Sequence, residues 1–210
     1  MKYKKALVSL VLSLILNSVA QAGASSQADN KDTADSAIHR IDFLNFTYHP
    51  SVCAKEFGKG GIGKTVRVRN GEFKNNEVYY GIVEDKVIYG DLTHDHSEEA
   101  VVHIGCGYFS ANYGLSEIFV FATKVNEAIL LASLNENDIK RDYQASYPEG
   151  ITWRIIDEGV RVVKGDLVVN LYTEGAHCCP EYIATIRYRW NGTSLVRAGK
   201  IERKKISKGQ

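Results

Sequence analysis

The sequence predicts a mainly β fold, with α+β as the alternative: an antiparallel sandwich or curved sheet with one short helix, cross-linked by disulfides. Three observations support this fold class. From Ile38 onward, short runs of β-branched and aromatic residues alternate with Gly, Asn and Asp, a pattern typical of strands and turns. Only one segment has a helical pattern, and four cysteines are available for pairing. Short turns join most of the expected strands, which favours antiparallel pairing.

The chain is expected to have four parts. Residues 1–22 have the pattern of a cleavable signal peptide, in which three lysines precede an apolar run and small residues follow it. Residues 23–36 lack large apolar side chains and are expected to form a disordered leader. Residues 37–203 are long enough to form a single β-rich domain with its own core, and residues 204–210 are expected to be a basic tail.

The signal peptide predicts a periplasmic or secreted protein. No later segment approaches the roughly 20 apolar residues that a spanning helix needs, so no transmembrane segment is expected in the mature chain. No cysteine directly follows the cleavage site, so no lipid anchor is expected. Without the three lysines of the signal, the 26 basic residues fall to 23 against 25 acidic ones, a balance that argues against nucleic-acid binding.

The clearest expected strand is Tyr182–Trp190, in which alternate side chains are apolar, as in a half-buried strand. Asn191-Gly192 follows it and is typical of a tight hairpin, so Ser194–Val196 is expected to begin the returning strand. One helix is expected at Glu136–Ala145, with Asn135 as its N-cap. The other expected strands are Val66–Arg69, Val78–Val83, Lys86–Tyr89, Ala100–Ile104, Ile118–Ala122, Ala128–Leu131, Ile151–Ile156, Val160–Val163 and Leu167–Tyr172.

The segment Gly58–Thr65 satisfies the Walker A pattern of nucleotide-binding proteins letter for letter. A phosphate-binding loop, however, needs a buried strand before it and a helix after it, because the helix N-terminus supplies the amides that hold the phosphates. Here Ser51–Phe57 is polar and charged, and Val66–Arg69 alternates like a strand. The sequence therefore favours a glycine-rich loop without a nucleotide.

The acidic loop, residues 91–99, lies between two expected strands and carries oxygen-bearing side chains at alternate positions. Such spacing is expected to turn these side chains inward around calcium, which takes about six to eight oxygen ligands. The candidate ligands are Asp91, Thr93, Asp95 and Glu99. One alternative is an Asx-type turn, in which the carboxylates accept hydrogen bonds from backbone amides. His94 and His96 suggest zinc or copper as another alternative.

Four cysteines follow the signal peptide: Cys53, Cys106, Cys178 and Cys179. An even number in an exported chain predicts disulfides. A bond between the adjacent Cys178 and Cys179 would close a strained ring, so each is expected to pair with one of Cys53 and Cys106. Each bridge would stabilise the fold by about 2 to 4 kcal/mol. A redox-active pair at Cys178 and Cys179 stays open as an alternative.

Two elements resemble a group of small exported bacterial proteins. They are an acidic turn at Asp91 leading into Ala100-Val101-Val102 and Cys106, and His177-Cys178-Cys179-Pro180 before a final hairpin. The group is that of the LppP/LprE-like lipoproteins, and the resemblance covers residues 78 to 200. It implies an envelope protein without an established catalytic role and transfers no active site. Membrane anchoring is not implied, because this chain lacks the lipidation cysteine.

Two common catalytic motifs are absent from the sequence, the Gly-x-Ser-x-Gly elbow of serine hydrolases and the His-Glu-x-x-His motif of zinc enzymes. The leading hypothesis is therefore a non-enzymatic β domain that binds an envelope component or a ligand, with calcium as a candidate stabilising ion. The alternative is an exported hydrolase or thiol-active protein that uses the acidic loop or His177-Cys178-Cys179. The sequence identifies neither the partner, the ligand nor the oligomeric state.

Overall fold

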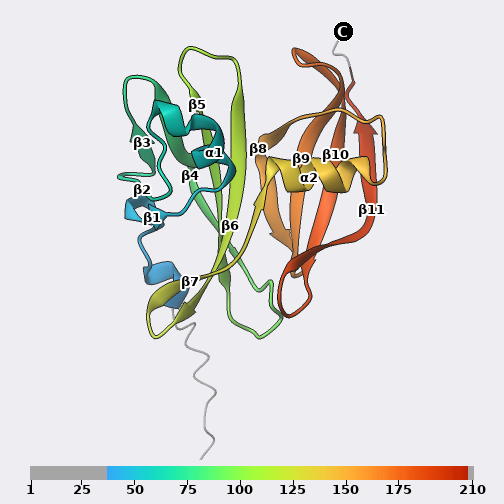
Figure 1. The fold of residues 1–210 in the computed structure, drawn as a ribbon. Coiled ribbons are helices and arrows are strands. Elements are labelled where there is room, and N and C mark those ends of the chain that lie inside the picture. Colours follow the sequence, from blue (N-terminus) through green and yellow to red (C-terminus); the bar gives the residue numbers. More distant parts are fainter. Residues whose placement is uncertain (1–36, 208–210) are drawn as a thin grey trace, which may run out of the picture. The chain divides into compact units, whose positions relative to one another are not determined.

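The computed structural model describes residues 37–207, and the expected signal peptide and leader lie outside the described residues. Two antiparallel sheets dominate it, which confirms the mainly β fold class (Figure 1). The five-stranded sheet runs in the order β3 (Glu72–Lys74), β4 (Val78–Gly90), β5 (Glu99–Tyr108), β6 (Gly114–Lys124) and β7 (Glu127–Asn135). The four-stranded sheet runs in the order β11 (Leu195–Lys205), β10 (Cys179–Trp190), β9 (Asp166–Ala176) and β8 (Thr152–Val163).

The remaining elements are short. Strands β1 (Thr47–Tyr48) and β2 (Val66–Arg67) pair with each other, and the two α-helices are α1 (Val52–Phe57) and α2 (Glu136–Gln144). Single 3-10 turns occur at η1 (Ala37–Arg40), η2 (Phe43–Asn45) and η3 (Gly58–Gly60). Within residues 37–207, neither α-helix has the length and apolar character that crossing a membrane requires.

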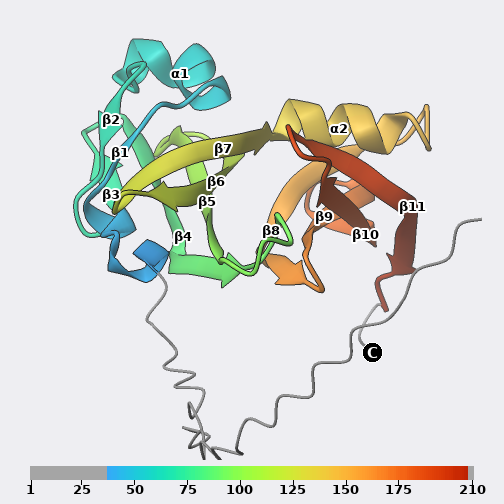
Figure 2. The ribbon, with the colours of Figure 1, turned by 90° about the horizontal axis from the view of Figure 1, so that it is seen from below.

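The five-stranded sheet is covered on both faces (Figure 2). On one face it packs against the N-terminal segment that contains α1, where Phe43, Tyr48 and Phe57 are buried. On the other face it packs against α2 and the four-stranded sheet, through side chains such as Ile139 and Leu167. Strand β5 is therefore buried along most of its length, which explains why it is almost continuously apolar rather than alternating.

Two pairs of expected strands are single strands in the structure. Strand β4 includes the two expected strands Val78–Val83 and Lys86–Tyr89. The polar residues between them form a bulge, in which Glu84 and Asp85 have φ values of 57° and 50°. Strand β8 likewise continues through residues 157–159 with shifts in register. A bulge adds residues without ending the strand, so polar residues that indicate a turn in the sequence mark only a bend here.

The expected helix is confirmed as α2. Asn135 accepts hydrogen bonds from the amides of Asn137 and Asp138, and the Asp138 carboxylate accepts one from the amide of Asn135, which completes a capping box. The structure adds a second α-helix, α1, that the sequence did not indicate. Glu117 of β6 caps it by accepting hydrogen bonds from the Ser51 and Cys53 amides at 2.8 and 3.0 Å. This cap is distant in sequence, so no local pattern predicts it.

The glycine-rich segment at Gly58–Thr65 follows a helix and precedes a strand, the reverse of the order in a phosphate-binding loop. The structure constrains two of its glycines. Gly60 lies so close to β4 that an added Cβ would be 2.4 Å from Val78 Cγ1, and Gly61 has a φ of 113°. The sequence interpretation as a glycine-rich loop is thus confirmed, and close packing accounts for Gly60, whereas an added Cβ on Gly58 would have no neighbour within 4 Å.

The expected disulfide pairing was wrong. Cys53 of α1 is bonded to Cys106 of β5, and both are fully buried. Cys106 shares the face of β5 that packs against the N-terminal segment, whereas Cys178 and Cys179 belong to the β9–β10 hairpin of the other sheet. The five-stranded sheet therefore separates the pairs that were expected to bond.

The C-terminal hairpin is confirmed, with Trp190 paired to Leu195 across the expected turn. The expected basic tail, however, starts inside the sheet, because Lys204 and Lys205 pair with Ile183 and Tyr182. A run of charged residues forms a strand here because most of these side chains are exposed at the sheet edge.

Candidate functional site

The two candidate sites of the sequence lie at opposite ends of β9 (Figure 1). The acidic loop packs on the β8–β9 turn, where an added Cβ on Gly165 would be 2.1 Å from His94 Cε1. Cys178 and Cys179 lie at the other end, in the β9–β10 hairpin. Because an 11-residue strand spans about 35 Å, the loop and the cysteines do not form one site.

Glu99 organises the acidic loop. Its carboxylate is 1% exposed and accepts hydrogen bonds from the amides of Leu92 and Thr93, at 2.7 and 3.1 Å, and from the Thr93 hydroxyl at 3.1 Å. Burial nevertheless raises the pKa of Glu99, because desolvation of the charged form outweighs these hydrogen bonds. The carboxylate thus holds the loop to the start of β5 through backbone amides.

The other two candidate ligands also accept hydrogen bonds from backbone amides. Asp91 accepts one from His96 at 3.1 Å, and Asp95 accepts one from Ser97 at 2.8 Å. The bond of Asp95, which reaches two residues along the chain, is the Asx-turn arrangement that the sequence offered as the alternative, and Asp91 caps an amide farther along the loop. In the part of the chain that the structure describes, no group of three or more His, Cys, Asp or Glu is arranged to hold a metal. Calcium binding, like zinc or copper binding, stays a prediction.

We expect Glu99→Ala to lower the free energy of unfolding by about 2 kcal/mol, because it removes the acceptor of three hydrogen bonds and leaves two backbone amides without their partner. Urea unfolding of chelator-treated protein measures the loss. Glu127→Ala, at an exposed carboxylate of β7, is the control. Adding calcium tests the metal: a higher unfolding midpoint in the wild type but not in Asp95→Ala would confirm the calcium site, and a loss near zero in Glu99→Ala would contradict the role of Glu99.

A cleft opens between the two sheets at the end opposite the acidic loop. Its floor on β5 includes Gly105, and the neighbouring Gly107 pairs with Gly114 of β6. An added Cβ on Gly107 would be 2.9 Å from the Tyr79 hydroxyl oxygen. The absence of side chains at these positions lets the Tyr79 ring lie close to the sheet and leaves space in front of β8. We call this space of about 580 Å³ the inter-sheet cleft.

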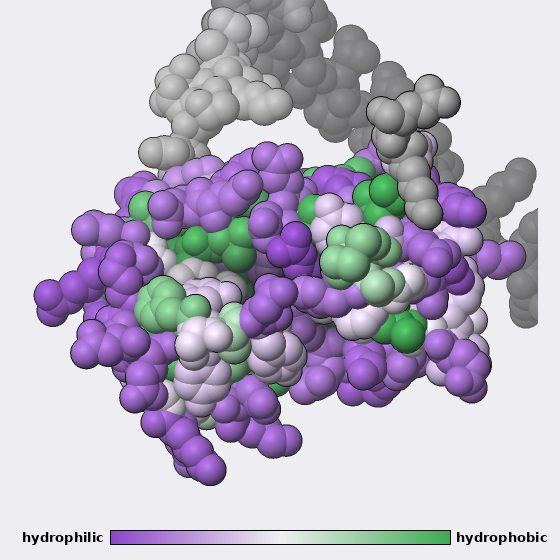
Figure 3. Space-filling model, turned by 90° about the horizontal axis from the view of Figure 1, so that it is seen from above, coloured by the Kyte–Doolittle hydropathy of each residue, from purple (hydrophilic) through white to green (hydrophobic). Residues whose placement is uncertain are grey.

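A second space adjoins it at the tip of the β9–β10 hairpin. This hairpin hollow measures about 1310 Å³ and contains His177, Cys178 and Cys179 in its wall. Four residues line both spaces: Asn112, Trp153, Arg154 and His177. We call the two adjoining spaces together the groove. On the corresponding face of the molecule, apolar patches alternate with hydrophilic side chains (Figure 3).

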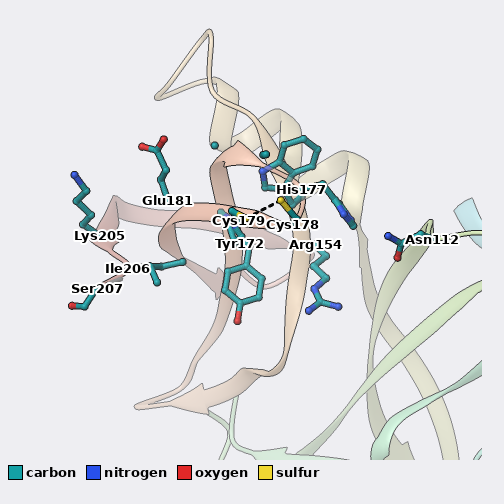
Figure 4. Close-up of a pocket in the computed structure, with 14 residues that line it drawn as sticks. Asn112, Arg154, Tyr172, His177, Cys178, Cys179, Glu181, Lys205, Ile206 and Ser207 are labelled. Atoms are coloured by element: carbon teal, nitrogen blue, oxygen red, sulfur yellow. Dashed lines mark hydrogen bonds between the residues drawn. The ribbon is translucent and has the colours of Figure 1, made fainter. Parts of the chain in front are cut away.

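Strand β8 supplies the central side chains of the groove. The Trp153 indole donates a hydrogen bond to the Glu174 carbonyl at 3.0 Å and meets the His177 ring edge to face, with centroids 5.5 Å apart. The Arg154 guanidinium lies 5.6 Å from the Tyr172 ring centroid, and both side chains project in the same direction (Figure 4). Within residues 37–207, Arg154 has no carboxylate within salt-bridge distance. Its charge is thus available to a ligand.

Carboxylates balance the charge of the groove. Glu136, at the start of α2, lines the inter-sheet cleft, and partial burial raises the pKa of its carboxyl to about 7. Hydrogen bonds from Ser116 and the Ile155 backbone oppose this rise. The raised pKa means that some of the Glu136 carboxyl is protonated at neutral pH, and the protonated carboxyl can both donate and accept a hydrogen bond.

Sequence reasoning identified His177, Cys178 and Cys179 as candidates but missed Trp153 and Arg154. Both were assigned to an ordinary strand, and nothing in the local pattern shows that the strand faces a cleft. The alternating glycines of Ile104-Gly105-Cys106-Gly107 were the available signal, since glycine within a strand marks a bulge or a close approach.

No protein-family profile, no curated protein and no solved structure matches the chain. The resemblance to the LppP/LprE-like lipoproteins accordingly stays a prediction. The residues of the groove are the remaining evidence for a function.

Proposed function

We propose that the protein is an exported, non-enzymatic β domain that binds an oligosaccharide of the cell envelope in the groove. Two side chains of β8 carry the proposal. The Trp153 indole is fixed by its own hydrogen bond, and the Arg154 guanidinium has no salt-bridge partner among the described residues. Binding sites of this kind combine apolar or aromatic surface with a few polar groups that fix the orientation of the ligand.

The chemistry of the lining favours a neutral, polyhydroxylated ligand. Aromatic rings line the groove along its length, and they offer flat apolar surface to the C–H faces of sugar rings. They are Tyr79, Tyr113, Trp153 and Tyr172. The planar polar groups of Asn112 and Arg154 line the same groove and can form paired hydrogen bonds with neighbouring hydroxyls.

The charges of the groove do not select an ion of one sign. Arg154 and Lys205 are cationic, whereas Glu84, Asp157 and Glu181 are anionic, and Glu136 is partly protonated. Charges of both signs lie along the groove, so an anion or a cation would meet groups of its own sign. Hydroxyl groups, which both donate and accept hydrogen bonds, are compatible with each of these side chains.

Export is supported by the buried Cys53–Cys106 bond. Structural disulfides form and persist in the periplasm or outside the cell and are rare in the cytosol. An exported domain of this kind would meet envelope polysaccharides directly.

We expect the protein to bind a hexamer of N-acetylglucosamine or of glucose, and Arg154→Gln to weaken binding about tenfold, because a charge-assisted hydrogen bond contributes about 1.5 to 3 kcal/mol. The chain has two tryptophans, Trp153 and Trp190, so Trp190→Phe makes Trp153 the sole fluorescent reporter in a titration. Calorimetry on the wild type gives the affinity independently.

Arg161→Gln is the matched control, since Arg161 is an exposed arginine near the other end of β8. Unchanged binding in this variant and weakened binding in Arg154→Gln would support the groove as the site. If neither hexamer binds, or if both variants bind as tightly as the wild type, the saccharide proposal is wrong.

The alternative hypothesis, an exported hydrolase or thiol-active protein, stays a prediction. The acidic loop offers it less support, because Asp91, Asp95 and Glu99 all accept hydrogen bonds from backbone amides. The cysteine pair, in contrast, has a geometry that indicates a separate property.

A further inference from the structure

Cys178 and Cys179 hold their sulfur atoms together at the tip of the β9–β10 hairpin. The two Sγ atoms are 2.8 Å apart, about 0.8 Å longer than the roughly 2.05 Å of a disulfide bond. Both residues are exposed in the wall of the hairpin hollow. The adjacent thiols thus lie almost at bonding distance in a place that a soluble reagent can reach.

The backbone of the hairpin fixes this arrangement. Cys179 pairs with Ala176 across the turn, and Gly175 has a φ of 68°, which lets the strand bend just before the turn. An added Cβ on Gly175 would be 2.7 Å from the Cys179 carbonyl oxygen, so the two sides of the hairpin are tightly packed. Because the turn holds the thiols together, closing the ring costs less conformational entropy than in a free chain. The strain of a ring between adjacent cysteines remains, and it makes the bond easier to reduce again.

We propose that Cys178 and Cys179 form a reversible disulfide with each other by exchange with a small-molecule disulfide. One cysteine, as the thiolate, attacks the small-molecule disulfide and releases one thiol, which leaves a mixed disulfide on the protein. The second thiolate then attacks the protein sulfur of the mixed disulfide and releases the second small thiol. The pair loses two protons and two electrons, and the small-molecule disulfide is reduced to two thiols.

The bond would change the wall of the groove. His177 precedes the pair directly, and its ring contacts the Trp153 indole, so a ring closed at Cys178 and Cys179 alters the surroundings of the central aromatic side chain. In Figure 4 the sulfur of Cys178 lies beside His177 on the same wall. This inference does not depend on the saccharide proposal, because its readout is a covalent bond rather than ligand binding.

The test is incubation of the folded full-length protein with oxidised glutathione, followed by alkylation and trypsin digestion. Both cysteines fall in one tryptic peptide, residues 165–187. We expect this peptide to lose two hydrogen atoms, to be protected from alkylation, and to regain both thiols after treatment with dithiothreitol. The fluorescence of Trp153 in the Trp190→Phe variant is expected to change with the same time course.

Cys178→Ser and Cys179→Ser are the controls, since each lacks the second thiol that would release glutathione from the mixed disulfide. These variants are expected to accumulate the mixed disulfide, whereas the wild type passes through it. A persistent glutathione adduct on the wild type, unreacted thiols after prolonged incubation, or disulfide-linked dimers would each overturn the proposal.

Discussion

Replacing both cysteines of the buried disulfide, as Cys53→Ala with Cys106→Ala, is expected to lower the free energy of unfolding by about 4 kcal/mol. The bond closes a loop with a sequence separation of 53 residues, and a cross-link of that span restricts the unfolded chain by about this amount. Denaturant unfolding of the double variant measures the change. The loss would be large, because small domains are stable by only about 5 to 15 kcal/mol.

Reduction of the wild type should reproduce this loss, because it breaks the same bond without changing the sequence. Cys178→Ser is the control substitution, and its stability is expected to stay within about 0.5 kcal/mol of the wild type, as for other exposed residues. If the double variant is as stable as the wild type, the Cys53–Cys106 bond does not hold α1 to β5.

Acidification from pH 7 to pH 4 is expected to lower the free energy of unfolding by about 3 kcal/mol more in the wild type than in His103→Gln. His103 is 3% exposed on β5, and burial lowers its pKa from 6.5 to about 4. The folded state therefore keeps this histidine neutral while the unfolded chain binds a proton. The stabilisation is fully present above pH 6.5 and is lost as the pH falls towards 4.

Urea unfolding at both pH values measures this difference. His49→Gln, at an exposed histidine, is the control and should follow the wild type. The charge of Asp157 opposes the effect of burial on the pKa of His103, so a small difference between wild type and His103→Gln would mean that Asp157 compensates for the burial. That outcome would contradict the prediction.

Local patterns in the sequence predicted much of the fold. The hairpin at Asn191-Gly192 and the helix capped by Asn135 both depend on neighbouring residues, and both are confirmed. Helix α1 depends on Glu117, which lies on another element, and it was missed. Cysteine pairing failed for the same reason, since it depends on which face of the five-stranded sheet Cys106 occupies.

The sequence did not indicate the groove. Its lining comes from strand β4, the β5–β6 hairpin, the start of α2, strand β8, the β9–β10 hairpin and the end of β11, and their proximity follows from sheet packing alone. Arg154 in an exposed strand position is ordinary by itself. Only the packing of the five-stranded sheet, which places Gly105 across the cleft, gives Arg154 a pocket in front of its side chain.

Strand β5, buried on both faces, links the stability of the two layers that cover it. If the N-terminal layer separated, Val102 and Ile104 would become exposed to water, and if the C-terminal sheet separated, Val101 would become exposed. Either event removes packing from a strand that the other layer also needs. We therefore expect the layers to unfold as one cooperative unit, so that a destabilising substitution far from the groove also removes the groove by unfolding the whole domain.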